Sequence, residues 1–203
     1  KDLSQSIGGP KGLARPGDFV IENDKGRFAI LGNRPSMGNH TDGGSILDAD
    51  LQRPSGQYAQ GHGADRLGEI FTSVNLQVAE IGHEAGEVKI LNDGKNGEDA
   101  VICTVGDARG FISLLQLASG LLGDFEQIRT DYILSPGRSA LQIRTYVDTT
   151  GTLDCSGPAP ESNPVEYTDG PAQLIGLITS GGLALGDFTL FGGGVDVFVP
   201  QGG

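Results

Sequence analysis

The 203-residue sequence has no tryptophan, one methionine and two cysteines. It also lacks any stretch of about 18 consecutive apolar residues, the length that a transmembrane helix needs, so we expect no such helix. Basic side chains are the scarcer charge, because 14 Lys and Arg face 26 Asp and Glu and leave a net charge of −12. An acidic surface repels a phosphate backbone, and we therefore expect no nucleic-acid partner.

Glycine, by contrast, is abundant. The chain contains 34 glycines and 10 prolines without the triplet period of collagen, which suits many turns and short strands better than long helices. Apolar runs recur along the whole length, which argues against a disordered chain. We interpret residues 1–203 as a single β-sandwich domain. We also interpret it as a fragment of a longer polypeptide, because it begins at Lys1 and stops directly after a strand-like run.

The clearest structural signal lies between residues 128 and 147. β-Branched and aromatic residues alternate with polar ones on both sides of Pro136-Gly137, which predicts two half-buried strands joined by a reversing turn. Residues 67–74 and 111–118 carry apolar side chains at helical spacing, which permits one or two short helices. Further short apolar runs predict strands at 18–22, 26–31, 45–51, 74–81, 87–91, 100–105, 172–179, 187–191 and 195–199.

These segments predict an all-β fold, an antiparallel β-sandwich with one or two short helices. The proline-containing stretch 152–171 predicts a surface excursion. It contains Cys155, whereas Cys103 lies in an apolar run. A bridge between them would pin the excursion to the sheet and stabilise the fold by roughly 4 kcal/mol. The alternative is one buried and one exposed free thiol, and export from the cell favours the bridge.

The segment 128–151 resembles the strand–turn–strand of galactose-mutarotase-like supersandwich domains. Together with segments 17–24, 43–50 and 186–200 in the same order, it more closely resembles a β-rich region at the front of large exported proteins of myxobacteria and related bacteria. The resemblance implies a supersandwich-like fold, a secreted, periplasmic or cell-surface location, and an accessory role. The partners that it implies are other domains of the same polypeptide or protein subunits. The catalytic His and Glu of mutarotases have no matching positions here, so it implies no epimerase activity.

Four side chains in two polar loops are candidate ligands for a transition metal. His40 and Asp42 share one loop, and His62 and Asp65 share the next, so the four side chains meet if the loops do. Their spacing is not that of a helical HExxH motif, and surface histidines without a ligand are the alternative. We therefore expect no cofactor, with a metal ion at these four residues as the alternative.

Asp48 and Asp50 form a second candidate site. Strand side chains alternate between faces, so the two carboxylates share one face about 7 Å apart along the strand. This arrangement suits a hard-cation site or an acid/base pair for sugar chemistry. The alternative is that both carboxylates point to solvent.

These observations predict a non-enzymatic, exported β-sandwich domain that serves binding, adhesion or assembly within a larger protein or complex. The alternative is a carbohydrate-active or metal-dependent hydrolase, or an accessory domain of one, that uses the His/Asp loops at 39–65. A carbohydrate-binding module is a third possibility. The absence of tryptophan and the presence of only four tyrosines count against it, because sugar-binding platforms use aromatic faces.

Overall fold

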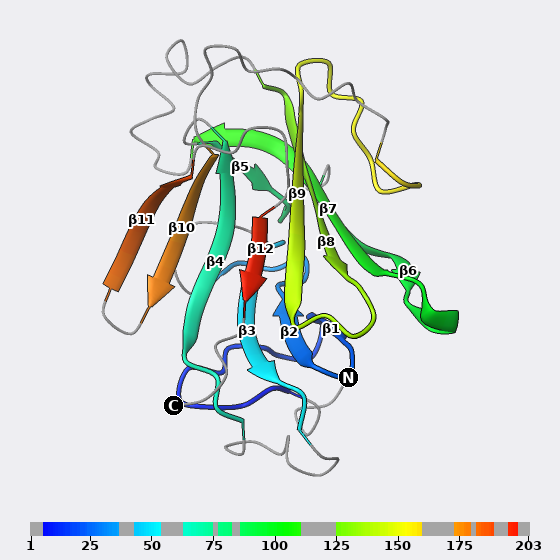
Figure 1. The fold of residues 1–203 in the computed structure, drawn as a ribbon. Coiled ribbons are helices and arrows are strands. Elements are labelled where there is room, and N and C mark those ends of the chain that lie inside the picture. The colour runs from blue at the N-terminus through cyan, green and yellow to red at the C-terminus, as the bar shows by residue number, and fades with distance from the viewer. Residues whose placement is uncertain are drawn as a thin grey trace.

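The computed structural model describes residues 6–36, 43–53, 63–74, 77–82, 86–110 and 125–159, and the backbone alone of residues 173–179, 182–188 and 195–198. The described residues form one sheet of twelve strands, and every strand pair in it is antiparallel (Figure 1). The strands are β1 (Phe19–Glu22), β2 (Gly26–Ile30), β3 (Ile46–Leu51), β4 (Leu67–Val74), β5 (Gln77–Glu80), β6 (Glu87–Asp93), β7 (Ala100–Gly110), β8 (Gln127–Leu134), β9 (Ala140–Asp148), β10 (Gln173–Thr179), β11 (Gly182–Phe188) and β12 (Val195–Phe198).

The sheet follows the order β1-β2-β3-β4-β5-β7-β8-β9-β12 and carries three further strands in two side branches. β10 pairs with β4, β11 pairs with β10, and β6 pairs with β7. Along this path the ladder is thinnest at β4, which pairs with β3 through one residue pair and with β5 through another. Buried side chains of β1–β4 and of β7–β9 pack against each other in one core, as in a sandwich.

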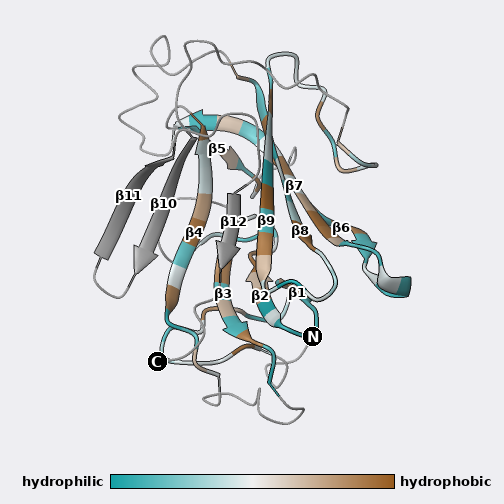
Figure 2. Ribbon diagram, viewed as in Figure 1, coloured by the Kyte–Doolittle hydropathy of each residue, from teal (hydrophilic) through white to brown (hydrophobic). Residues whose placement is uncertain are grey.

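The main core fills the space between β1–β4 on one side and β7–β9 on the other. Figure 2 shows apolar and polar bands along the strands of both parts, for example along β4 and β9. The apolar members point inward and exclude water from each other, which stabilises the fold in proportion to the area that they bury. The buried members are Ile21, Phe28, Ile30, Ile46, Ile70, Ile102, Tyr132, Leu134, Leu141 and Ile143.

Two smaller apolar clusters cover the outer faces of the sheet. The N-terminal segment packs Ile7 against Ala29, Leu31 and Leu47 on the outside of β2 and β3. On the outside of β7, Cys103 and Val105 pack against Cys155, which follows β9 in the sequence. Because both faces are covered, β2 and β8 are buried along almost their whole length.

The β8–β9 hairpin confirms the strongest sequence prediction. The backbone N–H of Arg138 donates to the carbonyl of Ser135 at 3.2 Å, which closes a four-residue turn. Gly137 has a φ of +71°, the left-handed conformation that the third position of this turn requires and glycine adopts without strain.

The predicted all-β sandwich class is confirmed, and the helix prediction is partly wrong. Residues 67–74 form strand β4 rather than helical turns, because both faces of β4 are packed and apolar residues therefore appear at both parities. Of the predicted strand 187–191, the first two residues belong to β11 and the others lie outside the described residues. The predicted helix at 111–118 lies outside the described residues. Among those described, the sole helical element is the short 3-10 turn η2 (Lys95–Gly97), which lies between β6 and β7.

Candidate functional site

The predicted site residues fall into two groups. His40, Asp42 and His62 lie outside the described residues. Asp65, Asp48 and Asp50 are described, and all three are buried with exposed fractions of 0%, 0% and 4%. The reading of Asp48 and Asp50 as solvent-facing is therefore wrong. We call these three side chains the carboxylate face, because they lie on and beside the outer face of β3.

Asp48 binds the N-terminal segment to β3. Its two carboxylate oxygens accept hydrogen bonds from the backbone N–H groups of Leu13 at 2.7 Å and Ala14 at 2.9 Å. Burial raises the pKa of Asp48, while these two N–H groups oppose the rise. Both oxygens are therefore occupied by main-chain donors that come from 34 and 35 residues earlier in the chain.

Asp50 binds the chain that follows β3. Its carboxylate pairs with the guanidinium of Arg53 at 2.8 Å and accepts the backbone N–H of Ala64 at 2.9 Å. Burial alone opposes ionisation of Asp50, but the hydrogen bonds from Arg53 and the backbone outweigh it and lower its pKa.

Asp65 completes the carboxylate face. Its Oδ1 accepts the backbone N–H groups of Ala49 at 2.9 Å and Leu67 at 3.1 Å, whereas its buried Oδ2 has no hydrogen-bond partner. Burial raises the pKa of Asp65 to about 7, and the negative charges of Asp48 and Asp50 add to the rise.

Glycine allows the backbone around the carboxylate face to approach closely. A Cβ atom on Gly63 would lie 1.9 Å from the carbonyl oxygen of Ile7, and one on Gly9 would lie 2.4 Å from the backbone nitrogen of Asp65. The N-terminal segment and residues 63–65 therefore lie backbone against backbone. The three carboxylates hold this contact in place by accepting N–H groups from both segments and from β3.

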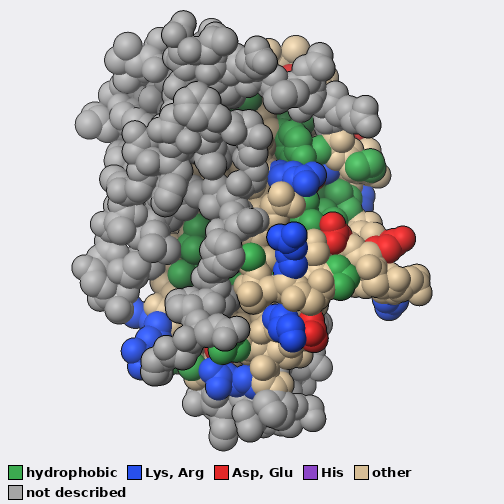
Figure 3. All heavy atoms as spheres, in the orientation of Figure 1, with side chains coloured by type: hydrophobic (Ala, Val, Ile, Leu, Met, Phe, Trp, Pro, Cys, Tyr) green, Lys and Arg blue, Asp and Glu red, His purple; other side chains and the backbone are tan. Residues whose placement is uncertain are grey.

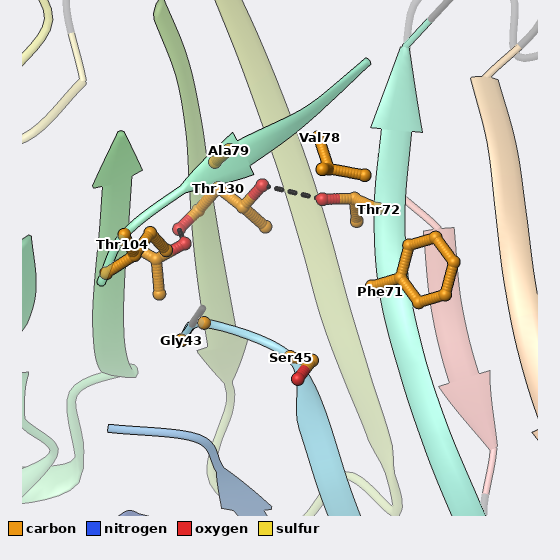
Figure 4. Close-up of a pocket in the computed structure, with 10 residues that line it drawn as sticks. Gly43, Ser45, Phe71, Thr72, Val78, Ala79, Thr104 and Thr130 are labelled. Atoms are coloured by element: carbon orange, nitrogen blue, oxygen red, sulfur yellow. Dashed lines mark hydrogen bonds between the residues drawn. The ribbon is translucent and has the colours of Figure 1, made fainter. Parts of the chain in front are cut away.

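A small cavity lies beside the N-terminal end of β3, between β4, β5, β7 and β8 (Figure 4). Its volume of about 20 Å³ is that of a water molecule rather than of an organic ligand. Thr72 and Thr130 point toward each other across it and their hydroxyls form a hydrogen bond of 2.9 Å. Thr104 donates to the backbone carbonyl of Thr130 at 3.2 Å. The cavity is therefore a polar gap between packed strands.

Sequence reasoning did not identify the most deeply buried ion pair. Arg129 and Asp131 on β8 are 1% and 4% exposed, and the guanidinium contacts both carboxylate oxygens, at 2.8 and 3.0 Å. Arg129 also donates to the backbone carbonyls of Asp154 at 2.6 Å and Gly157 at 3.0 Å. The signal in the sequence was the pair of opposite charges two positions apart within a β pattern.

The predicted disulfide is confirmed. Cys103 on β7 is bonded to Cys155, and their Cα atoms lie 5.8 Å apart. The bond and the contacts of Arg129 act on the same stretch of chain, residues 153–157, which we call the Cys155 segment. This segment therefore lies against the outer face of β7 and β8 through one covalent bond and three hydrogen bonds to its backbone, because the N–H of Leu153 also donates to Oε1 of Gln127 at 2.8 Å.

The described residues contain no group of three or more His, Cys, Asp and Glu side chains placed to hold a metal ion. On the carboxylate face, every oxygen except Oδ2 of Asp65 accepts a hydrogen bond from a backbone N–H or a guanidinium. These oxygens bind parts of the chain to one another, which is a structural role.

The raised pKa of Asp65 predicts a pH-dependent stability. Asp65 holds its proton more tightly in the folded protein, with a pKa of about 7, than at its ordinary value of 3.8. The free energy of unfolding should therefore fall as pH rises from about 4 to about 7. Asp65→Asn keeps an acceptor at Oδ1 and cannot ionise. As pH rises through that window, the free energy of unfolding of the variant minus that of wild type should therefore increase by up to about 1.4 kcal/mol per pH unit.

Urea unfolding of wild type and Asp65→Asn at pH 5 and pH 8 measures this difference. Asp48 also has a raised pKa and is present in both proteins, so the comparison reports the ionisation of Asp65 together with its repulsion from Asp48. Parallel pH dependence in the two proteins would mean that Asp65 ionises as easily in the folded state as in the unfolded one.

No helix in the described part of the chain is long and apolar enough to span a membrane. A scan against protein-family models finds no matching family, and searches among curated proteins and solved structures find no match either.

Proposed function

We propose that the chain is a non-enzymatic, exported β-sandwich domain that serves binding, adhesion or assembly with other domains of its polypeptide or with other subunits. The observation that carries this proposal is that the side chains of the carboxylate face bind the protein's own backbone. Asp48, Asp50 and Asp65 are the described side chains best suited to metal or acid/base chemistry, yet they hold backbone segments together. A carboxylate whose oxygens are already bonded to the chain has little capacity left for a substrate or a metal ion.

The disulfide supports the exported part of the proposal. Disulfides form and persist in oxidising compartments such as the periplasm and the cell exterior, and are rare in the cytosol. The bond between Cys103 and Cys155 is compatible with such a location. The acidic balance of the chain suits a soluble surface module of this kind.

One observation favours a hydrolase as the second candidate function. Oδ2 of Asp65 is buried without a partner, and a pKa of about 7 lets this carboxyl act as a general acid at neutral pH. A hydrolytic role would require its Oδ2 to face a substrate, whereas a structural role requires only Oδ1.

Turnover assays of the exported, disulfide-bonded chain separate the two functions. The substrates are chromogenic glycosides and esters, and elemental analysis of the same sample measures bound metal. For a binding domain we expect Asp65→Asn and Asp48→Asn to change thermal stability and to leave the background hydrolysis unchanged. Turnover that disappears in Asp65→Asn, while the variant keeps its fold, would overturn the proposal and establish the hydrolase.

A further inference from the structure

β6 lies at the edge of the described part of the sheet. Within the described part of the chain it pairs with β7 alone, and in Figure 1 it forms the right-hand margin of the fold. An unpaired edge presents a row of backbone N–H and C=O groups that can pair with another strand. The bulge of β6 lies between Ile90 and Asn92, so residues 87–90 form a regular run.

Three side chains of this run are about half exposed. Ile90 is 50% exposed and is the large apolar residue most open to solvent among the described side chains. The side chains of Glu87 and Lys89 are 46% and 48% exposed and point to the same face of the strand. Oε1 of Glu87 and Nζ of Lys89 lie 3.7 Å apart. Figure 3 shows acidic, basic and apolar side chains close together along this margin.

We propose that β6 pairs antiparallel with the β6 strand of a second copy of this chain, about a two-fold axis at Val88. This inference rests on the proposed function, because it gives the assembly domain a partner. In this register Glu87 of each copy lies opposite Lys89 of the other, which creates two charge pairs across the junction. Opposite charges placed directly across two strands attract each other, and like charges in that position repel.

The other face of the strand fits the same register. Val88 lies opposite Val88 of the second copy, and Ile90 lies opposite Gly86, which has no side chain to oppose it. The half-exposed Ile90 therefore gains a neighbouring strand that covers part of its surface. The pairing is isologous, as expected for a two-fold dimer, since the same residues contribute from both copies.

Charge and the bulge of β6 exclude the neighbouring two-fold registers. An axis at Lys89 places the two Lys89 side chains opposite each other, and an axis at Glu87 does the same for the two carboxylates. An axis at Ile90 carries the ladder across the bulge between Ile90 and Asn92, where the regular run of β6 ends. A lysine on a strand edge usually discourages pairing. In this dimer Lys89 lies opposite Glu87 of the other copy, so the lysine favours one register and does not discourage pairing.

The predicted junction is short, and its affinity is correspondingly low. A ladder of about five residues buries less than the roughly 1,200 Å² of a standard stable interface. The dimer should therefore form at high protein concentration, or where copies are held close together by a larger assembly. This behaviour suits a domain that associates only after it has been concentrated at its site of action.

Charge reversal at Glu87 and Lys89 tests the register. Sedimentation velocity over a concentration series, on the oxidised full chain at low salt, measures the dissociation constant of the dimer. Lys89→Glu and Glu87→Lys each place like charges opposite each other twice and should weaken the dimer by at least about tenfold. The double variant E87K/K89E restores both pairs and should return the constant to within about threefold of wild type.

Mixing the two single variants is the sharper measurement. One variant carries two lysines at positions 87 and 89 and the other carries two glutamates, so a one-to-one mixture should form a heterodimer more stable than either homodimer. Both positions are about half exposed, so circular dichroism and thermal unfolding should be unchanged and serve as the control for folding.

Two results would overturn the inference. One is a wild type that remains monomeric at millimolar concentration, and the other is a dimer whose affinity does not change in the single variants, which would place the contact on another surface. Neither result changes the outcome of the turnover assay that tests the proposed function. A monomer without turnover leaves the binding domain in place, whereas turnover that depends on Asp65 overturns that function whether or not β6 dimerises.

Discussion

Replacing both cysteines of the Cys103–Cys155 disulfide by alanine is expected to lower the free energy of unfolding by about 4 kcal/mol. The bond joins residues 52 positions apart, and a cross-link over that distance removes much of the conformational freedom of the unfolded chain. The two buried sulfur atoms also pack with Val105, Leu91 and Leu153, so a further part of the loss comes from packing.

The measurement is a urea titration of wild type and the C103A/C155A variant, each with and without a reducing agent. The reductant should lower the unfolding midpoint of wild type. It should leave the variant unaffected, because the variant has no disulfide to break. Equal midpoints for oxidised wild type and the variant would show that the bond does not constrain the unfolded state to any measurable extent.

Local signals were sufficient to predict most of the strands, whereas the disulfide was favoured over two free thiols only on the expectation of export. The β8–β9 hairpin has alternating side chains and a Pro-Gly turn, both of which are encoded within a few residues. The two cysteines allowed one pairing. β4 was mistaken for helical turns, because apolar residues at 67, 70, 71 and 74 satisfy a helical period as well as a strand that is packed on both faces.

The burial of the carboxylates could not be read from the sequence. Alternation correctly placed Asp48 and Asp50 on one face of β3, but it could not show what covers that face. The donors come from Leu13, Ala14 and Ala64, which are brought there only by the tertiary fold. A polar residue in a strand predicts exposure by default, and a distant backbone N–H is the usual reason when that prediction fails.

Arg129→Met is expected to lower the free energy of unfolding by about 3–5 kcal/mol. The side chain of Arg129 is 1% exposed, and its guanidinium is the ion-pair partner of the buried Asp131. Removing the guanidinium leaves a buried carboxylate without that cation, which costs more than the loss of the ion pair alone. It also removes the donors to the carbonyls of Asp154 and Gly157.

The double variant R129M/D131L is the matched control, with chemical denaturation as the measurement. Two apolar side chains of similar length replace the ion pair, so no charge remains buried, and most of the lost stability should return. If the double variant is as unstable as Arg129→Met, the loss comes from the missing hydrogen bonds to the Cys155 segment and not from the buried, unpaired carboxylate of Asp131.

Arg129 and the disulfide should be energetically coupled, because both hold the Cys155 segment against β7 and β8. Without the disulfide, the carbonyls of Asp154 and Gly157 are less firmly held near the guanidinium. Arg129→Met should therefore cost less in the C103A/C155A background than in wild type. A double-mutant cycle measures this difference directly. The loss of the buried cation beside Asp131 is common to both backgrounds, so the coupling reports the two hydrogen bonds to the Cys155 segment. Strictly additive losses would mean that Arg129 holds the segment equally well without the covalent bond.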